Sequence, residues 1–256
     1  MNRSVLRVQL ARAYVLHQRP FRDSSLIVEV FARDYGRFTV FAHAARGPRS
    51  RFASLQPFRA LLLSWSGRGE APSLVAAEAE VEAEAEAEAE VAPGLPAARL
   101  MSGFYLNELL LKLLTRHDPH PALFDQYRAT LAQLRRSPSA DAPLRLFETR
   151  LLDFIGYGLN LAAEADTGQP VRPEAHYQFR PGVHGFVVAE PASPGAIDGH
   201  VLHGLAAGSV LTGEAQLRQA RSLMRAALDH CLEGRELATR TVARSLSGYP
   251  RRERRV

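Results

Sequence analysis

The first 80 residues of the chain alternate apolar and polar side chains in short runs that turn residues separate. An alternation with period two is typical of β-strands with one buried face. Asp34-Tyr35-Gly36-Arg37 and Gly67-Arg68-Gly69 are turn sequences of the kind that join the strands of a hairpin. We therefore predict five strands, at residues 8–16, 25–31, 36–42, 58–65 and 74–80.

From residue 97 onward the apolar side chains recur with the period of a helix. A buried helix that includes Leu100 and Phe104 is expected to end at His117-Asp118-Pro119. Further helices are predicted at 123–134, 143–154, 216–232 and 237–246, and residues 176–179 and 185–188 are predicted to form the arms of a hairpin.

These elements predict an α+β fold class: an N-terminal five-stranded OB-fold β-barrel, followed by a mainly α-helical domain with a small β-hairpin insertion. We place the barrel at residues 1–82, an Ala/Glu-rich acidic linker at 83–96, the helical domain at 97–247 and a basic tail at 248–256.

The strict Ala-Glu alternation of residues 76–91 leaves its own structure open, because the period suits a strand and the residue types suit a helix. One interpretation is a solvated low-complexity insertion. The other is an acidic strip that competes with nucleic acid for a basic surface.

Basic charge is concentrated at the N-terminus. Residues 1–70 contain twelve arginines against four acids, a net charge of +8, and Lys112 is the only lysine of the chain. A GC-rich coding bias is one explanation for so much arginine. The physical alternative is a polyanionic partner, because the guanidinium group grips phosphate and stacks on bases.

The loop at 45–52 contains Arg46, Arg49 and Arg51, and we interpret it as an electrostatic funnel for single-stranded nucleic acid. Most aromatic residues nearby occupy strand positions that face a core. Phe52 is the one that we expect to be exposed. The candidates for base stacking are Phe38, Phe41, Phe52, Phe58 and Trp65.

No catalytic motif stands out. The pairs His117/His120 and His200/His203 lack further ligands at matching spacing, so we predict no metal site and no other cofactor. Cys231, the only cysteine, is expected to be a buried thiol. Neither a phosphate-binding glycine loop nor a nucleophile elbow is present, so we expect no enzymatic activity.

The chain has no apolar run of about 18 residues and no secretory signal, so we expect a cytoplasmic protein with no membrane partner.

Several short sequence strings, which follow one another in the same order as in one family, resemble the bacterial recombination mediator protein RecO. Those of the barrel run through residues 14–20, 23–26, 36–37, 44–47, 55–58 and 67–70, and those of the helices through 105–110, 144–148, 151–152 and 156–160.

The resemblance implies an OB barrel joined to a helical domain, a nucleoid-associated location and a role in repair through the RecF pathway. Members of the family bind single- and double-stranded DNA and anneal complementary strands. They engage the acidic C-terminal tail of single-stranded-DNA-binding protein, and with RecR they help to load RecA. RecF is a further expected partner.

The resemblance also carries residue roles. Arg19, Arg37, Arg46 and Arg68 lie in matching strings and are the expected DNA contacts, to which Arg49 and Arg51 are added on loop charge alone. Arg145 matches an arginine that holds the partner tail. The residues expected to line the adjoining pocket, with core packing as their alternative role, are Leu144, Phe147 and Leu151.

The sequence departs from the family at two places. Some members carry four cysteines after the Gly156-Tyr157-Gly158 string, whereas residues 161–180 here have none. The acidic Ala-Glu run is also unusual. Two other functions stay open. The barrel by itself equally permits an RNA-binding OB-fold module. The other is a protein-interaction adaptor, whose helical domain matters more than its barrel.

Overall fold

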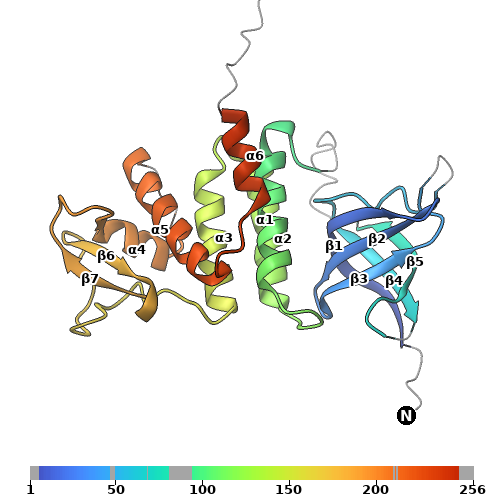
Figure 1. Cartoon of the computed structure of the whole chain (residues 1–256), viewed down its shortest axis with the longest axis horizontal. Coiled ribbons are helices and arrows are strands. Elements are labelled where there is room, and N and C mark those ends of the chain that lie inside the picture. The colour runs from blue at the N-terminus through green and yellow to red at the C-terminus, as the bar shows by residue number, and fades with distance from the viewer. Residues whose placement is uncertain are drawn as a thin grey trace, which may run out of the picture.

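A computed structural model of the chain describes residues 6–46, 50–67, 69–80, 94–209, 211 and 213–247. The molecule is elongated, with a β-barrel at one end, a small sheet at the other and helices between them (Figure 1). Mixed strands and helices give the predicted α+β class. Arg49, Arg68, residues 81–93, which include most of the acidic run, and the basic tail at 248–256 lie outside the described residues.

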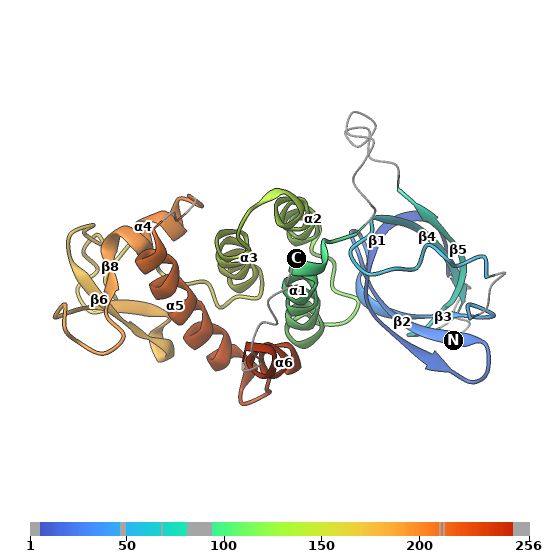
Figure 2. The same ribbon diagram turned by 90° about the horizontal axis from the view of Figure 1, so that it is seen from above.

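The N-terminal sheet closes into a barrel with the strand order β1-β2-β3-β5-β4. Its parallel closure between β3 and β5 runs through the pair Phe41 and Ser73, and Figure 2 shows the ring of strands. This is the predicted OB-type barrel. The strands are β1 (Leu6–Phe21), β2 (Ser25–Ala32), β3 (Gly36–Ala42), β4 (Leu61–Gly67) and β5 (Ser73–Ala79).

The first strand is longer than predicted, because it continues through Pro20 to Phe21 instead of ending at Leu16. Its pairing with β2 shifts by one residue between Val15 and His17. Such a bulge puts two residues of one strand opposite one of its neighbour and reverses which side chains face inward. The polar residues after Leu16 therefore remain in the sheet, alternately exposed and half-buried.

The expected exposure of Phe52 was wrong. Its side chain is only 3% exposed and belongs to the barrel core, together with Phe38 and Trp65. Arg51, which precedes it, places its guanidinium carbon 4.8 Å from the centre of the Phe52 ring. The loop thus returns to the barrel at Phe52, because a phenyl ring gains more from burial than from solvent contact.

The helical region begins with a short 3-10 helix, η2 (Ala97–Arg99), and ends at Ser247. Four predicted helices are confirmed, together with the helix expected from residue 97. Leu100 and Phe104 do not lie in the core, because their side chains are 36% and 41% exposed. The α-helices are α1 (Leu100–Leu113), α2 (Pro121–Arg136), α3 (Asp141–Phe154), α4 (Gly199–Ala206), α5 (Glu214–Leu232) and α6 (Ala238–Ser247).

The predicted hairpin is present as β6 (His176–Arg180) and β7 (Gly185–Ala189), joined by the 3-10 helix η3 (Pro181–Val183). A short strand that the sequence did not reveal, β8 (Ile197–Asp198), pairs with β6. Glu164 is buried in the preceding loop, where it accepts hydrogen bonds from the hydroxyl groups of Thr167 at 2.6 Å and Tyr177 at 3.3 Å. Side-chain hydrogen bonds therefore hold this segment, in which cysteine is absent.

The barrel is joined to the helices by an aromatic cluster. Tyr14 and Phe31 of the barrel lie against Phe124 and Tyr127 of α2, with ring centres 5.0–6.5 Å apart. Asn107 of α1 donates its amide to the carbonyl oxygen of Leu16 at 2.9 Å and accepts a hydrogen bond from Tyr127 at 2.5 Å. These buried contacts fix the barrel on the helices.

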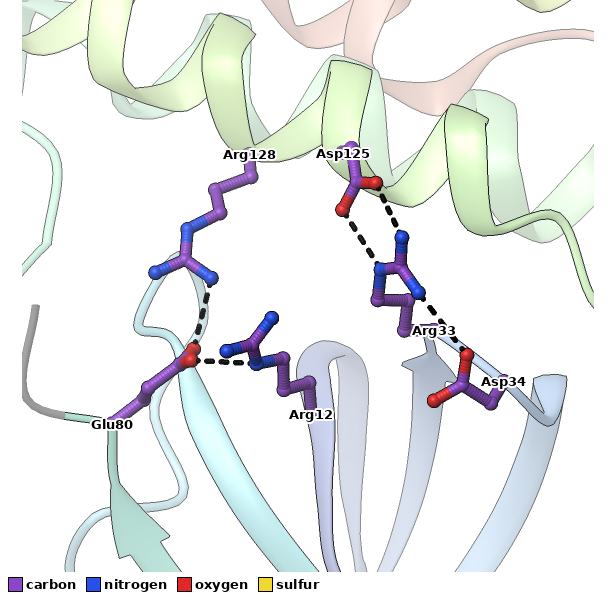
Figure 3. Close-up of polar contacts among 6 residues, drawn as sticks. All are labelled: Arg12, Arg33, Asp34, Glu80, Asp125 and Arg128. Atoms are coloured by element: carbon purple, nitrogen blue, oxygen red, sulfur yellow. Dashed lines mark hydrogen bonds and ion pairs between the residues drawn. The ribbon is translucent and has the colours of Figure 1, made fainter.

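Ion pairs also tie the barrel to α2 (Figure 3). Arg33 donates two hydrogen bonds to the carboxylate of Asp125, at 3.0 and 2.7 Å. Glu80 lies between Arg12 and Arg128, at 2.9 and 3.1 Å. Glu80 belongs to the acidic run, whose residues 76–79 continue β5. This part of the run is thus a strand, and the carboxylate that follows it pairs with arginines of the barrel and of α2.

Candidate nucleic-acid interface

The bulge in β1 turns a row of basic, aromatic and apolar side chains outward. Cross-strand pairing places Arg19 opposite Ile27, and Ile27 opposite Phe41. Phe21 lies two residues beyond Arg19, on the same side of the sheet. We name Arg19, Phe21, Ile27, Phe41 and the following His43 the outer face of the barrel. Each is at least partly exposed.

Aromatic rings form a line across the outer face. The ring centres of Phe21 and Phe41 are 5.6 Å apart, and His43 stacks on Phe41 with centres 6.4 Å apart and planes inclined by 20°. His43 is held by Ser73, because its Nε2 lies 3.3 Å from the Ser73 hydroxyl. Half-exposed rings in a row are a suitable platform on which bases can stack.

Arginines surround these rings. Arg19 is exposed and forms no ion pair with any described residue. The guanidinium carbon of Arg22 lies 5.2 Å from the centre of the Phe21 ring. Arg46 donates to the carbonyl oxygens of Arg22 and Asp23, both at 3.4 Å, and its backbone N–H donates to Ser24 at 2.9 Å. The start of the basic loop is therefore docked on the β1–β2 turn.

The outer face ends where the helical region covers the sheet. Glu29 of β2 accepts hydrogen bonds from Thr39 at 2.6 Å, from Arg116 at 2.7 Å and from Arg37 at 3.3 Å. Burial raises the pKa of Glu29, but the hydrogen bonds from Thr39 and Arg116 outweigh it and leave the pKa below its usual value. This ionised carboxylate anchors the loop after α1 to the barrel.

Arg37 belongs to this anchor and not to the outer face. Two of its guanidinium nitrogens donate to the carbonyl oxygen of Leu114, at 3.3 and 3.0 Å, and its side chain is only 12% exposed. A phosphate could not reach these donors without separating the barrel from the helices. We therefore propose that Arg37 holds this junction together and does not contact DNA.

Among the other expected contacts, Arg19 and Arg46 lie at the same end of the barrel, whereas Arg51 is exposed farther along the loop. Sequence reasoning missed Phe21 and Arg22, because it ended the first strand at Leu16. It also missed His43, which directly follows the third strand. The signal that it passed over is the reappearance of apolar side chains at Phe21 and Leu26, on both sides of a polar turn.

All four residues expected to hold a partner tail lie in α3, and three of them are buried. Phe147 and Leu151 are fully buried, which confirms core packing, their alternative role. Arg145 is 6% exposed and donates to Glu148 at 2.7 Å. Leu144 alone is half-buried at the edge of the core. A carboxylate that approached Arg145 would have to displace Glu148.

In the part of the chain that the structure describes, no three side chains gather as metal ligands do. Nor does any described helix combine the length and the apolar character that crossing a bilayer requires. The thiol of Cys231 is buried, and burial raises its pKa to about 11. Neutral at ordinary pH, it is a poor nucleophile.

Comparison with known proteins matches two segments of the chain to family models. Residues 7–80 match the family model of the recombination protein O N terminal domain, and residues 97–241 match that of the recombination protein O C terminal domain. Proteins named DNA repair protein RecO are 45% identical in Alkalilimnicola ehrlichii, where the match covers 96% of this chain and 94% of the relative, and 42% identical in Methylococcus capsulatus, where it covers 94% and 95%. The chain therefore belongs to the RecO family of DNA repair proteins.

Proposed function

We propose that the chain is a DNA-binding mediator of recombinational repair that binds single- and double-stranded DNA and anneals complementary strands. The observation that carries this proposal is the outer face of the barrel, where half-exposed rings lie among arginines. Stacking on Phe21 and Phe41 holds a single strand, while Arg19, Arg22 and Arg46 neutralise its phosphates.

Annealing needs charge neutralisation and bases that remain free to pair. Two strands repel each other through their phosphates, and arginines that contact the backbone remove this repulsion without reading a sequence. A shallow face on a barrel leaves the pairing edges of most bases accessible. No hydrolysis enters this account, and the names of the family and of the relatives state no enzymatic reaction.

The partners that we propose follow the family. RecR cooperates with the chain in loading RecA, RecF acts in the same pathway, and the acidic tail of single-stranded-DNA-binding protein docks on the helical region. Because Arg145 is paired and buried, we centre the proposed tail contact on the surface beside Leu144. RNA binding is the second candidate, because the same rings and arginines suit any single strand.

Replacing Phe41 with alanine tests the outer face. The substitution removes one stacking platform, so we expect single-strand affinity to fall by about 5- to 150-fold, equivalent to about 1–3 kcal/mol. The rate at which two complementary labelled strands anneal should fall with it. Fluorescence anisotropy measures the affinity, and energy transfer between the labels measures annealing.

Phe104 provides the matched control, because its ring is also partly exposed but lies on α1, away from the outer face. Phe104→Ala should leave both the single-strand affinity and the annealing rate near those of the unmodified protein. If the two substitutions weakened binding equally, the outer face would not be the site. Binding of RNA but not DNA by the unmodified protein would favour the RNA-binding alternative.

A further inference from the structure

The corner between α5 and α6 forms an open cavity of about 330 Å³, and four of the nine residues that line it are arginines. The two helices are drawn side on in Figure 1, with α6 next to α1. Four arginines against two carboxylates leave the charged lining with a net charge of +2. These charged residues are Arg225, Arg235, Arg240, Arg244, Asp229 and Glu236.

The corner is held firmly on α1. Glu108 accepts hydrogen bonds from the backbone N–H groups of Ala238 and Thr239, at 2.8 and 2.9 Å. Arg235 donates to the carbonyl oxygens of Leu232 and Lys112, at 3.0 and 2.9 Å. A carboxylate thus caps the start of α6 and a guanidinium caps the end of α1. The cavity is therefore a built feature of the helical region.

One carboxylate orients two of the arginines. Asp229 forms an ion pair with Arg240 and lies 3.8 Å from Arg225. Arg240 is mostly covered, and its guanidinium carbon lies 6.0 Å from the centre of the Tyr105 ring. Arg225 remains 61% exposed. Because an exposed pair at this distance contributes little, Arg225 can exchange Asp229 for another anion at small cost.

The basic character continues along α5 beyond the cavity. Arg218, Arg221 and Arg225 are 61%, 56% and 61% exposed. Their spacing of three and four residues places them on one face of the helix, over a length of about 10 Å. Each is paired with one carboxylate, and such a pair contributes little at the surface. A phosphate can therefore displace these partners along the three arginines, which form a track that leads into the cavity.

We propose that this track and the cavity bind the phosphates of a second nucleic-acid strand while the outer face of the barrel holds the first. The inference rests on the proposed function and deepens it, because it gives each annealing strand its own surface. In Figure 2, α6 and the β2–β3 side of the barrel lie along the same edge of the molecule.

A strand of phosphates suits the cavity better than a peptide does. The two leucines of its lining, Leu232 and Leu237, are only 2% and 3% exposed and belong to the core. The lining thus offers little apolar surface to a peptide side chain. A linear array of guanidinium groups matches instead a backbone that repeats one charge at regular intervals.

The test counts strands per chain. With the intact protein and a labelled oligo-dT too short to reach both surfaces, sedimentation at low salt should show two oligonucleotides bound to each chain. Arg225→Glu removes one charge-assisted contact and adds repulsion, so the second oligonucleotide should bind about tenfold more weakly while the first binds as before. Annealing should slow in parallel.

Arg150→Glu is the matched control, because Arg150 is also a partly exposed helical arginine, 3.7 Å from the carboxylate of Asp153. It should retain two oligonucleotides. One oligonucleotide per unmodified chain, or equal effects of the two reversals, would overturn the inference and leave the proposed function standing. No binding at all would refute the proposed function itself. An acidic peptide that bound the cavity where no second oligonucleotide did would assign it to a protein partner.

Discussion

Replacing Arg145 with alanine is expected to lower the free energy of unfolding by about 3–5 kcal/mol, because it leaves the carboxylate of Glu148 buried without its cation. Glu148 is 1% exposed and accepts hydrogen bonds from Arg145 and from the Tyr105 hydroxyl, both at 2.7 Å. Glu148 Oε2 and Arg145 Nε have no partner among the described residues. Urea unfolding followed by circular dichroism measures the change.

The double variant Arg145→Met, Glu148→Leu is the control. Because both charges are replaced by apolar groups of similar volume, it should be about as stable as the unmodified protein. A loss below about 1 kcal/mol in Arg145→Ala would show that the pair is not buried in solution. Arg145→Ala could lose tail binding simply because it is unstable. The loss therefore shows a contact between the tail and Arg145 only if the double variant, which also lacks the arginine, folds and still fails to bind the tail.

The ion pair between Arg145 and Glu148 also makes the stability of the protein depend on pH. Burial raises the pKa of Glu148 above its usual value, although Arg145 and Tyr105 oppose the shift. Between the unfolded and the folded pKa, folding takes up a proton, so this group makes the protein less stable as the pH rises through that window. Without Arg145 the carboxylate is harder to ionise. The destabilisation of Arg145→Ala should therefore be smaller at about pH 5 than at about pH 8.

Replacing Gly36 with alanine should destabilise the junction between the barrel and the helices by about 3 kcal/mol or more. Gly36 has a φ of +69°, and a Cβ atom there would lie 2.2 Å from the backbone oxygen of Asp118. Backbone cannot move aside as a flexible side chain can. The clash would press on the loop that Arg116 ties to Glu29. Urea unfolding and the protection of these amides from exchange measure the effect.

Gly69 is the matched control for Gly36, because its φ is also positive, +89°, but a Cβ atom there would meet nothing within 4 Å. Gly69→Ala should cost only the conformational strain, about 1–2 kcal/mol. If both substitutions cost the same, close packing of the barrel on the loop after α1 would play no part in stability.

The barrel could be predicted from sequence because its signals are local. Period-two alternation and the turns at 34–37 and 67–69 define five strands, and the structure changes their ends only by a few residues, apart from β1. That strand runs on because a bulge after Val15 lets polar residues remain in the sheet. Bulges depend on pairing with another strand, which a run of residues does not reveal. The short strand β8 escaped notice for the same reason.

The candidate site was harder to predict, because charge alone does not tell a binding arginine from a structural one. Arg37 and Arg145 look like surface cations in sequence, yet one donates to Leu114 and the other to Glu148. Phe52 follows a basic loop and looked exposed, but it lies in the core. Each case was decided by a contact between distant segments or by a pair inside a helix, which composition cannot show.

The most direct test of the central claim compares the salt dependence of single-strand binding in Arg19→Ala and Arg33→Ala. Arg19 is exposed on the outer face, whereas Arg33 is already engaged by Asp125. We predict a steep linear fall of log affinity with log salt for the unmodified protein. Its slope should decrease by about one in Arg19→Ala and stay unchanged in Arg33→Ala. A flat response of the unmodified protein, or equal slopes in the two variants, would contradict the account.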